Sequence, residues 1–294
     1  MLMEAFDVSE RRACKVAGQH RSTQRRRAKI PHDEPRLVAA MRRLSRRFPR
    51  YGYRMITTLL RREGWRVNTK RVERLWRKEG LQVRQNQRKR RRLGNSVNGC
   101  TRLAAERRNH VWSYDFVFDR TENGRPLKLL TLVDEYTREA LAIHVARTIK
   151  ADDVLEVLAS VMRERGAPEH IRSDNGPEFI ARRLRAWLHR CAIGTLFIEP
   201  GSPWQNAFVE SFNGTLRNEL LDGEMFFSVT EARSLVEDWR REYNTVRPHS
   251  SLDGMTPAAF GARCAGGGSA TLRHRRHSAE ATRSTLTMTT PNLS

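Results

Sequence analysis

The sequence predicts a basic all-α region followed by an α/β domain, and two observations indicate where one gives way to the other. Residues 1–110 contain 32 Lys and Arg against 9 Asp and Glu, whereas residues 111–262 contain 18 against 23. Apolar residues follow a helical period before residue 110, and strand-like and helix-like segments alternate after it. A chain of 294 residues is long enough for both parts.

The basic region carries the signals of several short helices. A capped helix is expected from Asp7 to Cys14, followed by a short helix or turn near Ser22. Apolar residues at helical spacing predict three further helices, over 37–44, 56–60 and 68–76. Gly64 and Gly80 are expected to end the last two of these helices.

This succession of helices and turns is typical of a helix-turn-helix, whose last helix can enter the major groove of DNA. Arg71, Arg74 and Lys78 on that helix are therefore candidate DNA contacts. The alternative is a small basic bundle that binds no specific sequence, and the pattern alone does not separate the two. Merely solvated Arg-rich helices are a further alternative, but the abrupt end of the charge bias near residue 110 favours phosphate binding.

The α/β domain is predicted from segments that alternate after His110. Strands are expected over 111–118, 127–133, 140–145, 170–173 and 195–198. Helices are expected over 151–165, 181–191, 207–221 and 229–243. Three hairpin-linked strands followed by alternating helices and strands is the element order of a ribonuclease-H-like core.

Four segments follow from these patterns. Residues 1–83 form the helical helix-turn-helix region, 84–109 a basic linker, 110–262 the α/β core with its C-terminal helices, and 263–294 a disordered basic tail.

Three acidic residues are the strongest candidates for chemistry. Asp115 lies within a predicted strand, where a structural residue would be apolar, and Asp174 directly follows another strand, before a turn. Glu210 lies on a predicted helix, and 35 residues lie between it and Asp174. Each could be an ordinary surface acid, but together they can hold two Mg²⁺ ions for phosphodiester chemistry. Asp134 could orient a loop of the site, although a structural role at the end of a strand is favoured.

The helix that carries Glu210 has one polar edge and one apolar stripe. Asn206, Glu210, Asn213 and Arg217 fall within roughly 60° on a helical wheel. Val209, Phe212, Leu216 and Leu220 form the neighbouring stripe. We therefore expect the stripe to pack on the core, while Asn206, Asn213 and Arg217 are candidate DNA contacts beside Glu210.

Other site types are not supported by the sequence. Cys14, Cys100, Cys191 and Cys264 are not paired at the short spacings of a zinc site, and free thiols in a reducing cytoplasm are expected. No stretch approaches the ~18 apolar residues of a membrane span. The N-terminus lacks the layout of a signal peptide.

The contexts of Asp115, Asp174 and Glu210 resemble those of bacterial insertion-sequence transposases of the "IS three" family, OrfB type, which belong to the retroviral-integrase superfamily. Arg217 matches a basic residue of the family's motif. Residues 243–252 and Thr256-Pro257 are similar to the family's segment after the core, and 50–54 and 71–76 are similar to its helix-turn-helix region. The resemblance covers roughly 7–258 and is highly specific.

The resemblance implies an integrase catalytic core of the DDE type, with Asp115, Asp174 and Glu210 as catalytic metal ligands and Mg²⁺ as cofactor, for which Mn²⁺ can substitute. It implies DNA cleavage and strand transfer at element ends, with terminal repeats and target DNA as partners. It also implies a homo-oligomer on DNA in the bacterial cytoplasm, associated with the nucleoid. An upstream partner, OrfA, is expected, usually fused to this chain by ribosomal frameshifting.

Two other functions remain open. The chain could bind element ends as a regulatory subunit that is inactive without OrfA, in which case DNA binding occurs without metal-dependent cleavage. A ribonuclease H proper is a weaker alternative, because the basic arm and the context of Glu210 suit transposition better.

Overall fold

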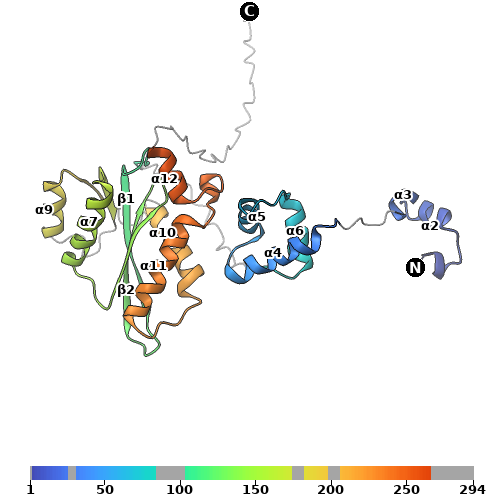
Figure 1. Ribbon diagram of the computed structural model, residues 1–294, viewed down its shortest axis with the longest axis horizontal. Coiled ribbons are helices and arrows are strands. Elements are labelled where there is room, and N and C mark those ends of the chain that lie inside the picture. The colour runs from blue at the N-terminus through green and yellow to red at the C-terminus, as the bar shows by residue number, and fades with distance from the viewer. Residues whose placement is uncertain (1, 26–30, 84–102, 174–181, 198–205, 266–294) are drawn as a thin grey trace, which may run out of the picture. The chain divides into compact units, whose positions relative to one another are not determined.

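The computed structural model describes residues 2–25, 31–83, 103–173, 182–197 and 206–265 (Figure 1). Its internal contacts divide the chain into two compact units, residues 1–85 and 86–294. Within the described ranges, no helix is both long and apolar enough to span a bilayer. Cys14, Cys191 and Cys264, the cysteines in those ranges, are free thiols.

The first unit begins with three short helices, α1 (Leu2–Ala5), α2 (Glu10–Val16) and α3 (Arg21–Gln24). Ser9 caps α2, because its side chain accepts a hydrogen bond from the backbone N–H of Arg12 at 3.4 Å. The predicted capped helix is therefore present, although it begins after the cap rather than at Asp7.

Three longer helices follow, α4 (Glu34–Arg47), α5 (Tyr53–Arg62) and α6 (Thr69–Lys78). Their apolar stripes are buried against one another, as the helical spacing predicted, through Leu37, Met41, Ile56, Leu60, Val72 and Leu75. Gly64 and Gly80 follow α5 and α6 with φ of +89° and +65°, a left-handed conformation that glycine adopts at helix ends. The predicted stops are confirmed.

The second unit is built on a mixed five-stranded sheet in the order β3-β2-β1-β4-β5. The strands are β1 (Val111–Arg120), β2 (Pro126–Asp134), β3 (Ala140–Ala146), β4 (His170–Ser173) and β5 (Gly194–Phe197). The hairpin-linked strands β1, β2 and β3 pair antiparallel, whereas β4 pairs parallel with both β1 and β5. This is the ribonuclease-H-like order that the sequence predicted.

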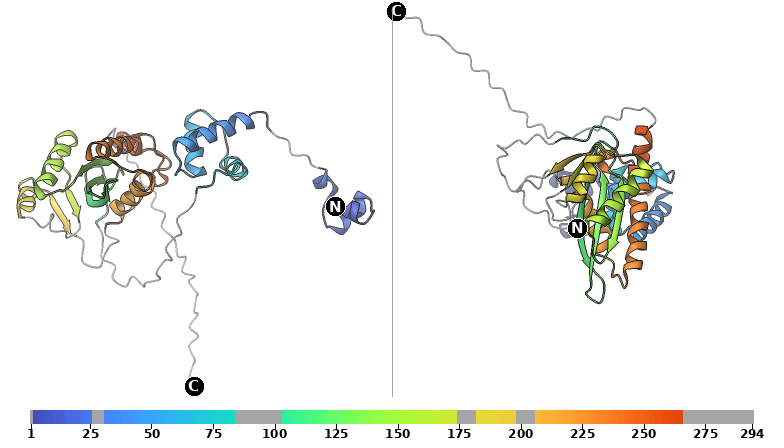
Figure 2. Two further views of the ribbon diagram at one scale, coloured as in Figure 1. Left: turned by 90° about the horizontal axis from the view of Figure 1, so that it is seen from below. Right: turned by 90° about the vertical axis from the view of Figure 1, so that its left-hand side faces the viewer.

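Helices cover both faces of this sheet (Figures 1 and 2). On one face, α7 (Ala151–Arg165) and α9 (Arg182–Arg190) pack with Trp112 and Tyr114 of β1. On the other, α10 (Ala207–Leu216) and α11 (Val229–Thr245) pack with Val117. Because side chains alternate along a strand, Asp115 shares the face of Val117 and lies under α10.

The C-terminal part of this unit differs from the expectation in two respects. The helix predicted over 207–221 ends as an α-helix at Leu216 and continues as a π-helical turn, η2 (Arg217–Leu221). A short 3₁₀ turn, η3 (Ser250–Leu252), and a helix, α12 (Pro257–Ala265), were not expected. The helix α12 continues past residue 262, where the core was expected to end. Its small residues gave a weak periodic signal, and a Cβ at Gly261 would lie 2.7 Å from Glu139 Oε2, so a larger residue there would have to displace that carboxylate.

A buried ion pair lies at the junction of β1, β2 and β4. The Nε of Arg172 is 2.9 Å from Oε1 of Glu135, and the two side chains are 5% and 0% exposed. The Ser113 hydroxyl donates to the same Glu135 oxygen, and Arg172 Nη2 donates to the Leu103 carbonyl oxygen at 2.7 Å. The pair therefore holds the segment before β1 against the sheet.

Removing one member of this pair should destabilise the fold. Arg172→Leu leaves the Glu135 carboxylate buried without its cation, and we expect the free energy of unfolding to fall by about 3–5 kcal/mol. The double variant Arg172→Leu with Glu135→Leu should recover much of the loss, because no charge remains buried. Urea denaturation followed by tryptophan fluorescence measures both effects. A single variant as stable as the wild type would contradict this role.

Candidate active site

Asp115 lies in the middle of β1, opposite Thr131 of β2. Its side chain is half-buried and lines an open groove of about 310 Å³ between β1 and α10. The groove is also lined by Glu210, Asn213, Gly214 and Arg217. The strand and the helix thus bring two of the three predicted carboxylates to one groove.

Glu210 is presented by the packing of α10. Val209, Phe212, Leu216 and Leu220 are all buried in the core on this face of the sheet, so the predicted apolar stripe is confirmed. Glu210 lies on the polar edge and is exposed. The stripe therefore fixes which way the helix faces and leaves the Glu210 carboxylate in the groove.

Asp115 is held by a hydrogen-bond network that sequence patterns did not reveal. The Asn213 Nδ2 donates to Asp115 Oδ2 at 2.9 Å. The Thr131 hydroxyl lies 2.9 Å from Asn213 Oδ1 and 3.1 Å from the Asp115 carbonyl oxygen, and its single hydrogen can serve either acceptor. Because the Thr131 hydroxyl lies beside Oδ1 of Asn213, the Asn213 amide is oriented with its NH₂ group toward the Asp115 carboxylate. The network aims one Asp115 oxygen at α10.

The other Asp115 oxygen, Oδ1, accepts the backbone N–H of Phe116 at 2.8 Å. The described part of the parallel strand β4 pairs with residues 111–113 of β1, just before Asp115. Asp174 lies outside the described residues, and the described part of β4 ends at Ser173.

Arg217 and Asn206, which were predicted to lie beside Glu210, differ in exposure. Arg217 lines the groove and is exposed, and its Nη2 donates to the Phe118 carbonyl oxygen at 3.0 Å. Asn206 is only 4% exposed, is the N-cap of α10 and is not among the described residues that line the groove.

The three candidate contacts on α6 all pair with acids near the start of α4. Arg71 Nη2 is 2.7 Å from Asp33 Oδ1, Arg74 Nη2 is 2.9 Å from Glu34 Oε2, and Lys78 Nζ is 3.9 Å from Glu34 Oε1. The side chains of Arg74 and Lys78 remain 58% and 61% exposed, against 23% for Arg71. The guanidinium of Arg71 holds the pKa of the Asp33 carboxyl below its usual value.

Asp134 has the structural role that the sequence favoured. It is fully buried at the end of β2, and its carboxylate accepts backbone N–H groups of Asn109, Tyr136 and Thr137 at 2.8–3.0 Å. Burial raises the pKa of the Asp134 carboxyl, and the three hydrogen bonds oppose that rise. Asp134 therefore fixes the turn between β2 and β3.

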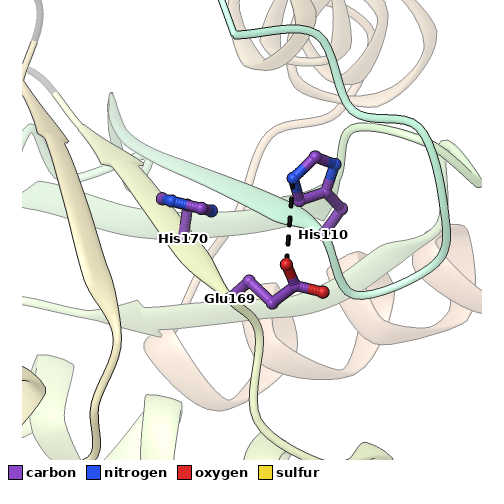
Figure 3. Close-up of side chains that lie close together, drawn as sticks. All are labelled: His110, Glu169 and His170. Atoms are coloured by element: carbon purple, nitrogen blue, oxygen red, sulfur yellow. Dashed lines mark ion pairs between the residues drawn. The ribbon is translucent and has the colours of Figure 1, made fainter.

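A second cluster of possible metal ligands lies at the start of β1 and β4 (Figure 3). Ligand atoms of His110, Glu169 and His170 lie within 4.8 Å of one another, and His110 Nε2 is 3.9 Å from Glu169 Oε2. The His110 Nδ1, however, accepts the backbone N–H of Glu106 at 3.1 Å. The neutral ring therefore carries its proton on Nε2, which leaves no lone pair for a metal there.

Glu169 in this cluster is also paired with a cation, because Arg107 Nη2 lies 2.5 Å from each carboxylate oxygen. We interpret His110, Glu169 and Arg107 as an anchor that ties the segment before β1 to β4. The groove with Asp115 and Glu210 has the better donor set for a hard divalent cation, because both groups are carboxylates and the groove is open to water.

Each of the two units matches a known family of protein domains. Residues 105–203 and 192–257 match models described as integrase core domain, and residues 32–90 match an HTH-like domain. The catalytic core domain of HTLV-2 integrase, solved in complex with magnesium, is similar at 18% identity with a TM-score of 0.43, over 53% of this chain and 97% of that one.

Insertion-element proteins are similar over most of the chain. A 31.7 kDa protein of element IS407 from Burkholderia multivorans is 40% identical over 89% of this chain and 94% of its own length. A 39.2 kDa protein of IS476 from Xanthomonas euvesicatoria is 41% identical over 89% of this chain and 75% of its own. The putative transposase InsK of IS150 from Escherichia coli is 29% identical over 72% of this chain and 77% of its own.

The helix-turn-helix-like unit, the integrase core with Asp115 and Glu210 in one groove, and this similarity along most of the chain lead to one conclusion: the protein belongs to the insertion-sequence transposases of the "IS three" family, OrfB type.

Proposed function

We propose that this transposase cleaves one DNA strand at an element end and joins the new 3′-hydroxyl to a second strand, using Mg²⁺ held by Asp115, Asp174 and Glu210. The observation that carries the proposal is the groove shared by Asp115 and Glu210. A mid-strand carboxylate and a helix carboxylate meet there, beside the exposed cation Arg217. Such a groove can accept a phosphodiester.

The two carboxylates suit Mg²⁺, which prefers oxygen ligands and keeps several waters. When bound, a pair of such ions activates the attacking oxygen and stabilises the leaving one. The chain's own residues bind the DNA and orient the carboxylates. Arg217 binds a phosphate, Asn213 and Thr131 orient Asp115, and the apolar stripe of α10 keeps Glu210 facing the groove.

Asp174 is proposed as the third carboxylate from the strand register. In the parallel pair of β1 and β4, Ser113 is opposite Arg172. The same offset of 59 residues separates Asp115 from Asp174. This offset and the motif around Asp174 support the assignment.

The DNA partners proposed are the terminal repeats and the target duplex. In the first unit, Arg74 and Lys78 are exposed enough to bind phosphates, and Arg71 would have to leave Asp33 to do so. Asn206 stays a prediction from the sequence. We further propose an OrfA partner or fusion, a homo-oligomer on DNA, and action at the nucleoid in the bacterial cytoplasm.

A DNA-end-binding subunit that is inactive without OrfA is the second candidate function. The strong positive charge of residues 1–110 favours it, since that region alone could bind DNA. The two candidates differ in one property: only the first requires the carboxylate groove for its activity.

Glu210→Gln should abolish nicking of a labelled duplex that carries the element's own end. The substitution keeps the shape of the side chain but removes its charge, so the site loses an anionic ligand. Nicking by the wild type should require Mg²⁺ or Mn²⁺ and should cease with EDTA. Gel electrophoresis of the labelled strand measures both.

The matched control is Glu164→Gln, the same chemical change on α7, an exposed position on the opposite face of the sheet. It should nick as the wild type does. If the wild type binds the duplex without nicking it, while a fusion with OrfA nicks, the second candidate function is correct for the separate chain. Nicking that survives in Glu210→Gln would show that the groove is not the site.

Asn213→Ala should raise the Mg²⁺ concentration needed for half-maximal nicking by about 10-fold, because partners that orient a metal ligand contribute on this scale. The Asp115 carboxylate loses the hydrogen bond that aims it at α10. Thr131→Val, which removes only the hydroxyl beside Asn213 Oδ1, should have a smaller effect of the same kind.

A purely structural role of Asn213 would lower the melting temperature without changing the metal requirement. We therefore expect the thermal stability of Asn213→Ala to stay close to that of the wild type. An unchanged Mg²⁺ requirement would show that Asn213 does not position Asp115.

A further inference from the structure

The π-helical turn η2 interrupts the helix of Glu210 at the point where Arg217 reaches the carboxylate groove of Asp115 and Glu210. The backbone N–H of Asp222 donates to the Arg217 carbonyl oxygen at 2.8 Å, five residues back rather than the four of an α-helix. Turns of this kind are rare and occur frequently at functional sites. Contacts with the rest of the fold must therefore stabilise η2.

Two leucines fix the apolar side of this turn. Leu220 and Leu221 are both buried, and so is Leu216 at the end of α10. In an uninterrupted α-helix, Leu216 and Leu221 would lie about 140° apart and could not both face the core. The wider turn brings Leu221 to the core, so the burial of apolar surface favours the π-helical conformation.

An ion pair fixes the polar side of the turn. Arg247, which follows α11, has its Nε 2.9 and 3.0 Å from Oε1 and Oε2 of Glu219 and its Nη2 2.8 Å from Oε1. The side chains of Arg247 and Glu219 are only 17% and 8% exposed. A guanidinium that bonds a carboxylate through two nitrogens fixes both its distance and its direction. The pair thus ties η2 to the end of α11.

The end of α11 that supplies Arg247 is itself held by several contacts. The backbone N–H of Arg247 donates to the Glu242 carbonyl oxygen at 3.0 Å. Its guanidinium lies 5.6 Å from the centre of the Tyr243 ring. That ring packs edge-on against Phe212 of α10, with 5.0 Å between the ring centres. Arg247 is therefore a fixed point from which the Glu219 carboxylate is held.

Arg217 and Glu219 leave the same turn in different directions, because residues two apart on a helix do not face each other. Arg217 is exposed and lines the carboxylate groove, whereas Glu219 is buried against Arg247. Neither Glu219 nor Arg247 is among the described residues that line this groove. Any influence of the pair on the groove must therefore pass through the backbone of η2.

We propose that Glu219 and Arg247 are positioning residues, which hold η2 so that Arg217 meets a phosphate in the carboxylate groove. The pair fixes the turn from behind. In front, Arg217 Nη2 donates to the Phe118 carbonyl oxygen at 3.0 Å and so fixes the guanidinium. The inference rests on the proposed function for the phosphate that Arg217 binds, and it gives the pair a role without contact to metal or DNA.

Arg247→Lys tests this role, because lysine keeps the charge that balances Glu219 but bonds it as a single point charge. We expect the nicking rate to fall by about 10-fold, since a shift of a positioned group by about 1 Å can cost up to roughly 100-fold. The Mg²⁺ concentration for half-maximal nicking should not change, because Asp115 and Glu210 keep their positions. Glu219→Asp, shorter by one methylene, should act in the same direction.

The matched control is Arg165→Lys. Arg165 forms a similar pair with Glu139, whose two carboxylate oxygens it bonds, and the side chains are 21% and 10% exposed. Neither residue is among those described as lining the carboxylate groove. Thermal denaturation should show a similar loss of stability in the two lysine variants, while only Arg247→Lys slows nicking.

A double-mutant cycle separates positioning from stability. Arg217→Ala and Arg247→Lys should each slow nicking and reduce the slope of log affinity against log salt by about 1, as for one lost phosphate contact. The double variant should match Arg217→Ala in both quantities, because the effect of Arg247 passes through Arg217. Independent effects would add. Additive losses, or wild-type nicking and slope in Arg247→Lys, overturn the proposal.

The same cycle with Glu219→Asp gives the answer independently of how well the lysine variant folds. The salt slope is measured in EDTA with the element-end duplex and needs no catalysis. Equal falls of the slope in Arg247→Lys and Arg217→Ala, without nicking by the wild type, would support the positioning and contradict the proposed cleavage. Nicking that depends on Glu210, with wild-type rate and slope in Arg247→Lys, would mean the reverse.

Discussion

The packing of α10 on the sheet is the constraint on which the rest of the site depends. Val209, Phe212 and Leu216 bury one side of the helix against β1 and β2. That packing sets Asn213 within hydrogen-bond distance of Asp115 and leaves Glu210 in the same groove. A rotation of the helix by one residue, about 100°, would separate the two carboxylates. The apolar core thus determines the geometry of the polar site.

Charge is distributed so that each part of the chain can do a different task. The region before the core has most of the cations, and several of them also hold it together, as Arg71 does with Asp33. The core brings the carboxylates of Asp115 and Glu210 to one groove, beside Arg217. Asp134 of the same core has a structural task instead, because its carboxylate fixes the turn between β2 and β3.

The sequence predicted the features of the site that depend on helical periodicity, but few of those that depend on the register of paired strands. The apolar stripe placed Glu210 correctly because a helix repeats every 3.6 residues. The same period grouped Asn206 with it, but the period alone does not reveal that Asn206 is the N-cap of α10 and only 4% exposed. The role of Thr131 could not be predicted from the sequence, since its place beside Asp115 and Asn213 depends on how β2 pairs with β1.

Cleavage of the protein backbone by bound Fe²⁺ would test the central claim, that Asp115 and Glu210 form the metal site. Fe²⁺ replaces Mg²⁺ at carboxylate sites and, with ascorbate and peroxide, generates radicals that cut the nearest backbone. Mass spectrometry should find fragments that end near Asp115 and near Glu210, and Glu210→Gln should lose them. Fragments that end near Glu169 and His170 instead would contradict this assignment and would place the metal in the cluster with His110.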